Sequence, residues 1–300
     1  MKIAALEQES FDEFLGYCRR HRSQLDDSFL IDEELAEFRL NEENPTYIAV
    51  DPQGRIAGAA SLMLNDYSRR GRKARLRILH AEEEEPVVYR ELLQAVLRHA
   101  AGMDKLNIFA PVMNKAEANK LAGAGFTVER YTYVLERDIK ELPDIGQPEQ
   151  YELRAFKPGA DEEVWSEVRN AGFARLQGSE TPVTPEMVKA MTAEADYIGG
   201  GMLLLYHDDK AVGIVRGSDD DYGGERVMSI GPLALLPEYQ GKGLGRVLLR
   251  AALQVAQASG YSKSILCVNA ENEQAKALYT GEGFREAEAL ACYKYDLKAE

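Results

Sequence analysis

The sequence predicts an α/β protein built from two similar halves, and three observations support this prediction. Segments with strand-like and helix-like hydrophobic spacing alternate along the 300 residues. Several residues of the first half recur in the second half at one constant separation. A glycine-rich loop in the second half joins an apolar strand to an apolar helix. A chain of this length also suits two domains of about 150 residues.

The first half, residues 1–141, begins with a strand and a helix. Phe11, Phe14 and Cys18 recur at three- and four-residue spacing, which places them on one helical face. Pro86 suits the first position of a later helix, because that position needs no N–H donor. Strands are expected over 2–6, 47–50, 56–64, 74–80, 107–112 and 126–139, and helices over 11–22, 32–40, 87–100 and 115–124.

The second half, residues 150–300, repeats this order after a linker over 142–149. Two prolines and a glycine near the linker interrupt the hydrophobic periodicity. Thr184 suits the N-cap of a helix. Strands are expected over 151–156, 202–206, 211–217, 226–235, 264–268 and 284–296, and helices over 161–173, 184–193, 243–259 and 273–282.

The last thirds of the two halves are related by an offset of 158 residues. Five identities in one register, within the same order of elements, indicate an internal duplication. The identical pairs are Asn114 and Asn272, Gly123 and Gly281, Gly125 and Gly283, Phe126 and Phe284, and Asp138 and Asp296.

Composition and charge exclude several functions. A net charge of −14 argues against nucleic acid as a partner, since phosphate contacts need clustered cations. The basic run Arg69–Arg77 is the exception, and we interpret it as a solvated hairpin, with a site for an anionic substrate or partner as the alternative. The absence of a long apolar segment and of a secretory signal predicts no membrane span and a cytoplasmic location. The three cysteines and four histidines are scattered, so no metal site is expected, and Cys267 should be buried in its strand.

The segment Ser229–Arg246 reads as a buried strand, a turn at Pro237 and a loop that opens a helix. Its glycines let the backbone approach a ligand, and the N–H groups at a helix N-terminus favour an anion. The segment lacks the Gly-Lys-Ser/Thr of a P-loop and the glycine order of a dinucleotide-binding fold. The segment therefore reads either as a phosphate cradle of another kind or as a plain glycine-rich turn between strand and helix.

Two motifs carry a resemblance to a known family. The order Gln240-x-x-Gly243-x-Gly245 resembles the acyl-CoA pyrophosphate loop of the GNAT N-acetyltransferase superfamily. Residues 272–284 fill every marked position of the GNAT pattern N-x-x-A-x-x-L-Y-x-x-x-G-F. The resemblance implies two tandem GNAT domains, each with a central mixed sheet flanked by helices, a layout similar to that of two-domain enzymes of the mycothiol synthase type.

The resemblance also assigns roles to individual residues. The backbone of Leu233, Ala234 and Leu235 would pair with pantetheine, and Asn272 would bind the cofactor arm. The residues implied around the pyrophosphate are Gln240, Gly241, Lys242, Gly243, Leu244, Gly245 and Arg246. Tyr279 matches the tyrosine that gives a proton to the departing thiolate. Side-chain roles for Lys242 and Arg246 remain open, and Tyr279 has the alternative role of covering the sheet edge.

The general base is not evident from the sequence. The position that holds a glutamate in some GNAT members is Ser229 here, and a serine without a partner is a poor base near neutral pH. Glu225 at the start of the strand is the catalytic candidate, with Asp219–Asp221 in the expected preceding loop as substitutes. Glu225 also has the alternative of a solvated loop residue, and an ordered water chain or a neutral amine would serve as well.

The first half departs from the family pattern. Leu121, Lys120 and Glu117 stand at the positions of Tyr279, Leu278 and Ala275. The glutamates of residues 82–85 replace the glycine loop and would repel a pyrophosphate. We therefore expect this half to bind no acyl-CoA.

The resemblance implies an N-acetyltransferase that moves an acetyl group from acetyl-CoA to a primary amine of a small molecule or peptide, without a metal. The alternatives are an aminoacyl or longer-acyl transferase and a non-catalytic acyl-CoA-binding module. A monomer or homodimer is expected.

Overall fold

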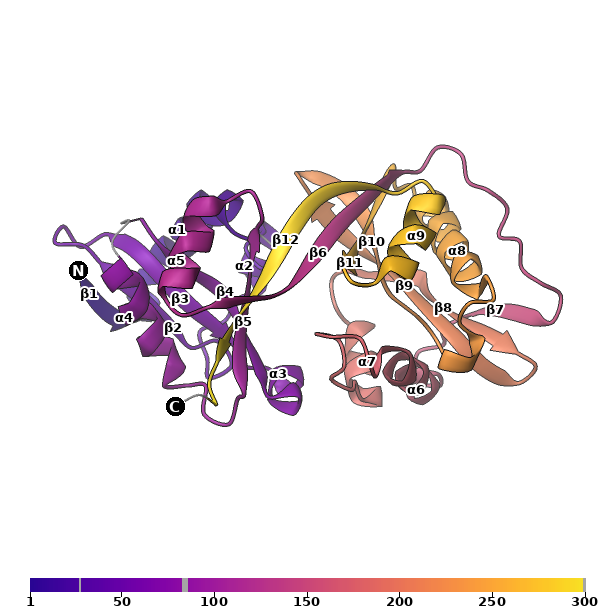
Figure 1. Cartoon of the computed structure of the whole chain (residues 1–300), viewed down its shortest axis with the longest axis horizontal. Coiled ribbons are helices and arrows are strands. Elements are labelled where there is room, and N and C mark those ends of the chain that lie inside the picture. Colours follow the sequence, from indigo (N-terminus) through magenta and orange to yellow (C-terminus); the bar gives the residue numbers. More distant parts are fainter. Residues whose placement is uncertain (27, 83–85, 299–300) are drawn as a thin grey trace. The chain divides into compact units, whose positions relative to one another are not determined.

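The computed structural model describes residues 1–26, 28–82 and 86–298, and its chain divides into two compact units. Unit 1 comprises Met1–Thr132 with Ala289–Glu300, and unit 2 comprises Tyr133–Glu288. In Figure 1, helices flank the strands of each unit. Strands β6 (Thr127–Asp138) and β12 (Arg285–Asp296) cross the division, so that each contributes residues to both units.

Unit 1 has a sheet in the order β1-β2-β3-β4-β5-β12. Its strands are β1 (Lys2–Ala5), β2 (Thr46–Val50), β3 (Ile56–Met63), β4 (Lys73–Ala81) and β5 (Lys105–Pro111), with the end of β12. Its helices are η1 (Gln8–Ser10), α1 (Phe11–His21), η2 (Arg22–Gln24), α2 (Asp32–Glu37), α3 (Asp66–Gly71), α4 (Pro86–Leu97) and α5 (Lys115–Gly123). Only β4 and β5 pair in parallel among the pairings described for this unit.

Unit 2 has a sheet in the order β6-β11-β10-β9-β8-β7. Its strands are β7 (Tyr151–Ala155), β8 (Tyr197–His207), β9 (Lys210–Tyr222), β10 (Glu225–Leu235) and β11 (Lys263–Asn269), with the other part of β6 and the start of β12. Its helices are α6 (Glu162–Phe173), α7 (Pro185–Met191), η3 (Pro237–Tyr239), α8 (Leu244–Ala258) and α9 (Glu273–Gly281). Here β10 and β11 pair in parallel, and β7–β10 form an antiparallel series.

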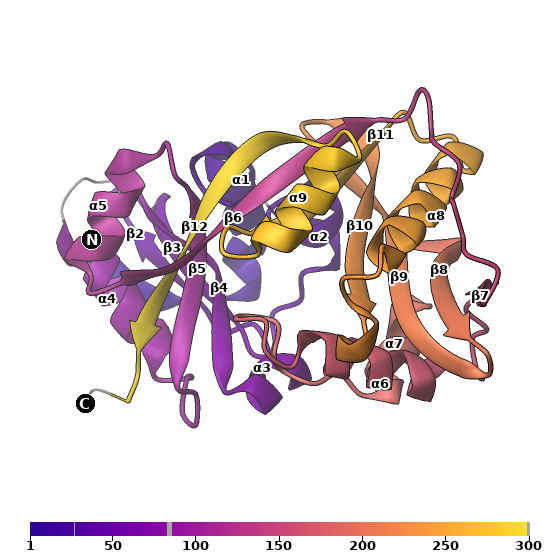
Figure 2. The ribbon, with the colours of Figure 1, turned by 45° about the vertical axis from the view of Figure 1, so that its right-hand side comes forward.

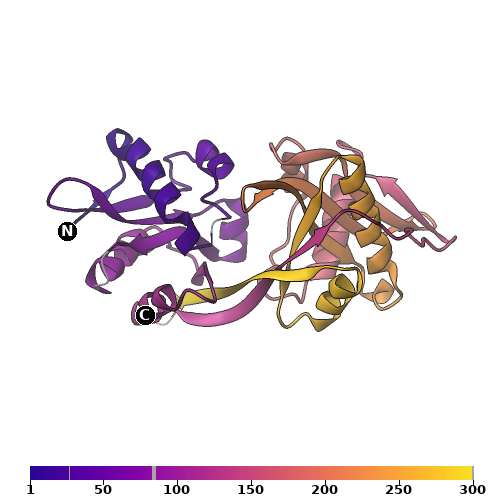
Figure 3. The ribbon, with the colours of Figure 1, turned by 90° about the horizontal axis from the view of Figure 1, so that it is seen from above.

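Both sheets are mixed and carry helices on their faces, which confirms the predicted fold class. In unit 2, Leu248 and Leu253 of α8 pack with Met228 and Ile230 on one face. On the opposite face α6 approaches so closely that a Cβ on Gly172 would lie 2.9 Å from Cβ of Ala234. Figure 2 shows β10 within this sheet, and Figure 3 shows β6 and β12 as neighbouring strands.

The parallel strands of each unit pair over only a short stretch. β10 and β11 are in register at Met228 with Ser264 and at Ser229 with Ile265, and no further pair was found in the described residues. A bulge between Ile230 and Leu233 then bends β10 relative to β9. The edge of β10 that faces β11 is therefore unpaired beyond Ser229, and a gap opens between the two strands.

The same arrangement recurs in unit 1, where β4 and β5 pair over three positions that end at Arg75 and Asn107. The duplicated residues also behave alike in both units. Asn114 and Asn272 each accept a hydrogen bond from a backbone N–H at the start of a nine-residue helix, α5 or α9. Gly125 and Gly283, which follow these helices, have φ of +95° and +85°. The structure thus supports the duplication predicted from the constant offset.

Three local expectations were wrong. The basic run is not a hairpin: its first residues form α3, and Arg77 on β4 is only 8% exposed. Asp219–Asp221 belong to β9 rather than to a loop, because β9 continues to Tyr222 in register with β10. Cys267 is exposed although its strand is apolar, because it points to the face of β11 opposite the buried Leu266 and Val268.

Candidate active site

The loop after β10 has the backbone shape that its glycines permit. Gly241 and Gly243 have φ of +73° and +80°, in the left-handed region that residues with a Cβ avoid. Gly243 is also the N-cap of α8 and provides no capping side chain. Gly245 is needed for packing, because a Cβ there would lie 3.2 Å from Cδ2 of Leu278.

This loop presents unpartnered donors. Throughout the part of the chain that the structure describes, the N–H groups of Gly241, Lys242 and Gly243 donate to no protein acceptor. The three residues are exposed, and they lead directly into the 15-residue helix α8. Consecutive N–H groups at a helix N-terminus favour an anion. The loop is therefore suited to hold phosphate oxygens.

The edge of β10 leads to this loop. Leu233, Ala234 and Leu235 pair with β9 on one side, whereas in the described residues no strand pairs with them on the other. Gln240 donates a hydrogen bond of 3.2 Å from Nε2 to the Leu235 carbonyl, which ties the loop to the end of the strand. The predicted strand edge and phosphate cradle are thus brought together.

Helix α9 places Asn272 and Tyr279 in the same unit. Oδ1 of Asn272 accepts from the Ala275 N–H at 3.2 Å, and its Nδ2 has no partner among the described residues. Tyr279 is 9% exposed and packs against Phe284, with 6.1 Å between ring centroids. Burial raises the pKa of the Tyr279 phenol to about 12, so the group keeps its proton at neutral pH.

The two basic side chains of the loop have partners within the protein. Nζ of Lys242 lies 4.8 Å from the centroid of the Tyr239 ring. Arg246 forms an ion pair of 2.8 Å with Glu282, a buried carboxylate that also binds Arg250. Arg246 thus secures α8 to the end of α9, which explains its presence without a phosphate contact.

Glu225 lies apart from these groups. It is the first residue of β10, eight positions before Leu233, and forms an ion pair of 3.2 Å with Lys263. At about 3.3 Å per residue, roughly 25 Å of strand separates Glu225 from Leu233. The gap between β10 and β11 opens only after Ser229, so the structure does not bring Glu225 to it.

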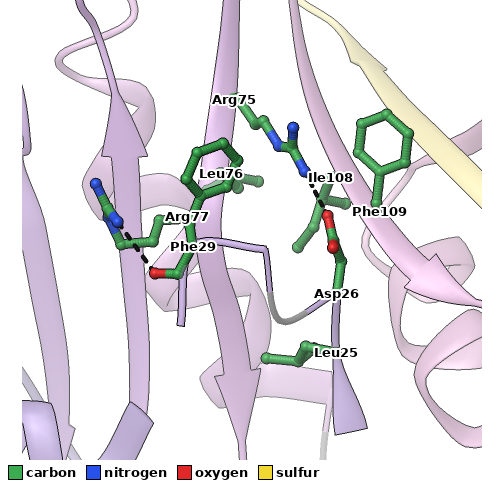
Figure 4. Close-up of a pocket in the computed structure, with 8 residues that line it drawn as sticks. All are labelled: Leu25, Asp26, Phe29, Arg75, Leu76, Arg77, Ile108 and Phe109. Carbon is green, nitrogen blue, oxygen red and sulfur yellow. Dashed lines mark hydrogen bonds and ion pairs between the residues drawn. The ribbon is translucent and has the colours of Figure 1, made fainter. Parts of the chain in front are cut away.

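In unit 1, Leu25, Asp26 and Phe29 lie at the corresponding gap, and with residues of β4 and β5 they line the pocket shown in Figure 4. Arg75, the last paired residue of β4, forms an ion pair with Asp26. Its guanidinium lies between the rings of Phe29 and Phe109, with Cζ 4.4 and 4.5 Å from their centroids. Nη1 of Arg77 donates to the Phe29 carbonyl at 3.1 Å.

The counterpart of Asn272 is also used internally. Nδ2 of Asn114 donates to the Gln24 carbonyl at 2.7 Å, so a protein carbonyl takes the donor that unit 2 leaves unpartnered. The Gln24 side chain shares a further hydrogen bond of 3.0 Å with His80, and His80 shares one of 2.6 Å with Tyr17. Burial lowers the pKa of His80 to about 3, so this network is neutral at pH 7.

Helix α5 has lost the matching chemistry. Leu121 is fully buried, Lys120 donates to the Ala81 carbonyl at 3.0 Å, and Glu117 accepts the Tyr89 hydroxyl at 2.7 Å. The predicted acidic loop of residues 82–85 lies largely outside the described residues, of which only Glu82 is described. That glutamate contacts His21 at 3.1 Å.

The described residues contain neither a metal-binding cluster nor a helix that could span a membrane. No cluster of three or more His, Cys, Asp or Glu side chains there is arranged to hold a metal ion. None of the described helices combines the length and apolar character needed to cross a bilayer.

Comparison with known proteins identifies the class of fold and site. Residues 164–284 match the acetyltransferase (GNAT) family. This segment includes the strand edge, the glycine loop, Asn272 and Tyr279, and the match confirms the resemblance drawn from the two motifs.

Particular relatives agree with this class. The chain is 29% identical over 208 residues to a mycothiol acetyltransferase of Arthrobacter sp. (strain FB24), covering 67% of this chain and 64% of that protein. It thus spans less than two thirds of that relative's length. Together with the family match, this similarity supports an acyltransferase enzyme.

Solved structures extend the likeness of fold to nearly the whole chain. A GCN5-related N-acetyltransferase from Sphaerobacter thermophilus superposes with a TM-score of 0.70 and 17% identity, covering 98% of this chain and 95% of that one. A tandem GNAT protein from the clavulanic acid biosynthesis pathway gives 0.70 and 15%, covering 98% of both chains. At these identities the likeness concerns the fold alone, and it supports the expected tandem layout.

Proposed function

We propose that the chain is an N-acetyltransferase that transfers the acetyl group of acetyl-CoA to a primary amine of a small molecule or peptide. The observation that carries this proposal is the run of unpartnered N–H groups at Gly241–Gly243, beside the unpaired edge of β10. The family match over residues 164–284 supports the same reaction class. Acetyl-CoA enters as a co-substrate, and no metal is required.

Different groups of unit 2 would bind different parts of acetyl-CoA. The N–H groups of the loop would hold the pyrophosphate, because free amide donors and the helix dipole both favour negative charge. The backbone of Leu233–Leu235 would hydrogen-bond the pantetheine amides, in the manner of a strand added to a sheet edge. Nδ2 of Asn272 would donate to the same arm, because its Oδ1 is already occupied by the helix cap.

Tyr279 would supply the proton for the leaving group. A phenol with a raised pKa is fully protonated at neutral pH and can donate to a thiolate as the thioester bond breaks. Its hydroxyl has no partner among the described residues and is not one of the fully enclosed, unsatisfied atoms. It therefore remains available to a substrate.

Unit 1 would bind no acyl-CoA. Asp26 and Phe29 lie at its strand gap against Arg75, and Asn114 donates to the Gln24 carbonyl. Residues 1–141 would then be a GNAT-like domain without a cofactor loop, joined by residues 142–149 to a catalytic domain of residues 150–300.

Release of coenzyme A thiol over a panel of primary amines tests the function. We expect amine-dependent release with acetyl-CoA, and the relative's name makes mycothiol metabolism one source of acceptors for the panel. Poor acetyl-CoA turnover beside good turnover of a propionyl or longer thioester would favour the longer-acyl alternative. Tight acetyl-CoA binding with no thiol release for any amine would favour the non-catalytic binding module.

A further inference from the structure

Asp220 and Ser229 lie on one face of the unit 2 sheet. Opposed residues of β9 and β10 share a face, and the register pairs Ser229 with Ser218 and Asp220 with Val227. Met228 and Ile230 lie in the core with α8, so Ser229 between them faces the other way. That other face is the one that α6 covers at Ala234.

Ser229 stands diagonally opposite Asp220 across β9 and β10, near enough for its hydroxyl to lower the pKa of the Asp220 carboxyl. Asp220 is half-buried, and one of its carboxylate oxygens accepts the Asp221 N–H at 2.9 Å. Ser229 is the last residue of β10 in register with β11, so it stands where the gap between these strands begins. A carboxylate supported by a hydroxyl therefore lies at the closed end of the gap whose edge and loop suit acetyl-CoA.

The charges around Asp220 are mostly negative. Asp196 and Asp221 act on it as like charges and, after burial, raise the pKa of Asp220, whereas the Asp221 N–H and the Ser229 hydroxyl lower it. The cation Arg216 on β9 is itself neutralised, because it binds both oxygens of Asp196 at 2.8 Å and is 3.5 Å from Glu194. This surrounding favours a cationic acceptor over a neutral or anionic one.

We propose that Asp220, acting through the Ser229 hydroxyl, takes up the proton that the acceptor ammonium must lose before it attacks the thioester. This inference rests on the proposed function and adds the proton acceptor that the sequence left open. Asp220 is a positioning and proton-holding residue, and the Ser229 hydroxyl is the group that meets the amine. Serine becomes a useful proton carrier only when a partner accepts its own proton, and here the partner comes from the adjacent strand.

Acetyl transfer combines proton movements with one bond formed and one bond broken. The ammonium proton moves to Oγ of Ser229 while the Ser229 proton moves to Asp220, which becomes neutral. The amine nitrogen forms a bond to the acetyl carbon, and the carbon–sulfur bond breaks with its electron pair on sulfur. The sulfur takes the Tyr279 proton. The second nitrogen proton returns through water to Tyr279, and Asp220 releases its proton to solvent.

The pair was missed in the sequence because its two members come together only through strand register. The sequence pattern predicts a loop at Asp220 and shows no partner for Ser229. A diagonal contact between β9 and β10 depends on where the hairpin turns, which falls between Tyr222 and Glu225.

The test measures kcat/KM against pH for an amine that the full chain acetylates, together with acetyl-CoA affinity. We expect Asp220→Asn to lower kcat/KM about 100-fold or more, the range of general base catalysis. Acetyl-CoA affinity should stay within about twofold of wild type, and the acid-side fall in kcat/KM should extend to higher pH, because only acceptor that is already neutral can then react. Asp220→Glu should restore part of the rate.

Asp219→Asn is the matched control, because Asp219 is the neighbouring carboxylate on the opposite face, bound to Arg226 and Tyr261. It removes the same charge and should leave the pH profile unchanged. Ser229→Ala removes only a hydroxyl and should lose rate as Asp220→Asn does. It provides the same test if Asp220→Asn does not fold.

Three results would overturn the inference. One is a wild-type rate and acid limb in Asp220→Asn or Ser229→Ala. Another is an equal loss in Asp220→Asn and Asp219→Asn, which would indicate a general effect of charge or stability. Wild-type protein that releases no thiol with any amine would contradict the proposed function itself, and the inference with it.

Discussion

Tyr279 combines two properties that are seldom found together in a buried residue. Its ring belongs to the core of unit 2, yet its hydroxyl has no hydrogen-bond partner among the described residues. The hydroxyl is also not fully enclosed, so a ligand can reach it. A phenol with a raised pKa is a proton donor at neutral pH. The unpartnered hydroxyl therefore favours the catalytic interpretation.

Tyr279→Phe should lower the rate of thiol release about 100-fold or more, because the leaving sulfur loses its proton donor. Acetyl-CoA affinity and thermal stability should stay close to wild type, since the ring is retained. Calorimetry for binding and a thiol assay for turnover separate the two effects. An unchanged rate would show that Tyr279 only fills the core.

Individual residues were predicted well where their role is local, and poorly where it depends on the sheet. The capping role of Thr184 follows from its place just before a helical pattern, and its hydroxyl accepts the Met187 N–H. The burial of Arg77 does not follow from its sequence neighbours, since a run of six basic residues resembles a solvated segment. Arg77 is buried because β4 carries it inward, where the Phe29 carbonyl accepts a hydrogen bond.

Helices α5 and α9 provide a natural comparison at the scale of the element. Both have nine residues and begin with an asparagine cap at the same duplicated position. In α9, Nδ2 of the cap asparagine has no partner among the described residues, whereas in α5 the same atom donates to the Gln24 carbonyl. The two helices thus share the asparagine cap and differ in whether the asparagine Nδ2 is available to a ligand.

Asn272→Ala and Asn114→Ala should each destabilise the protein by about 0.5–2 kcal/mol through loss of the cap. Only Asn272→Ala should weaken acetyl-CoA binding as well, because only Asn272 has a donor left for a ligand. Thermal unfolding and calorimetry on both variants check this difference. Equal effects of the two variants on acetyl-CoA affinity would show that Asn272 acts through helix stability alone.

Most elements were predictable from hydrophobic spacing and turn residues, and their order was predicted correctly. The helix α3 was missed because its six residues, Asp66–Gly71, carry almost no apolar periodicity. The gap between β10 and β11 was not predictable from residue types either. It results from a short parallel register and a bulge, and both depend on pairing between segments that lie far apart in the sequence.

The chain contains the same architecture twice, and the two units differ in what lies at the gap between their parallel strands. Each unit has a parallel strand pair that separates after a few residues. In unit 2 an exposed loop with unpartnered N–H groups follows the gap. In unit 1 Asp26 and Phe29 lie at the gap, and the donor of Asn114 is occupied. The duplication was visible in the sequence, but the residues that lie at the first gap were identified only in the structure.

The central claim is that the chain offers one acyl-CoA site and that unit 2 provides it. Calorimetric titration of the full chain with acetyl-CoA tests this most directly. The account predicts one molecule bound per chain, and affinity about tenfold or more weaker in Gly243→Ala, where a Cβ at φ +80° strains the loop. Gly281→Ala, a helical glycine with open space around it, should bind as wild type does. Two molecules bound per chain, none, or full affinity in Gly243→Ala would contradict the account.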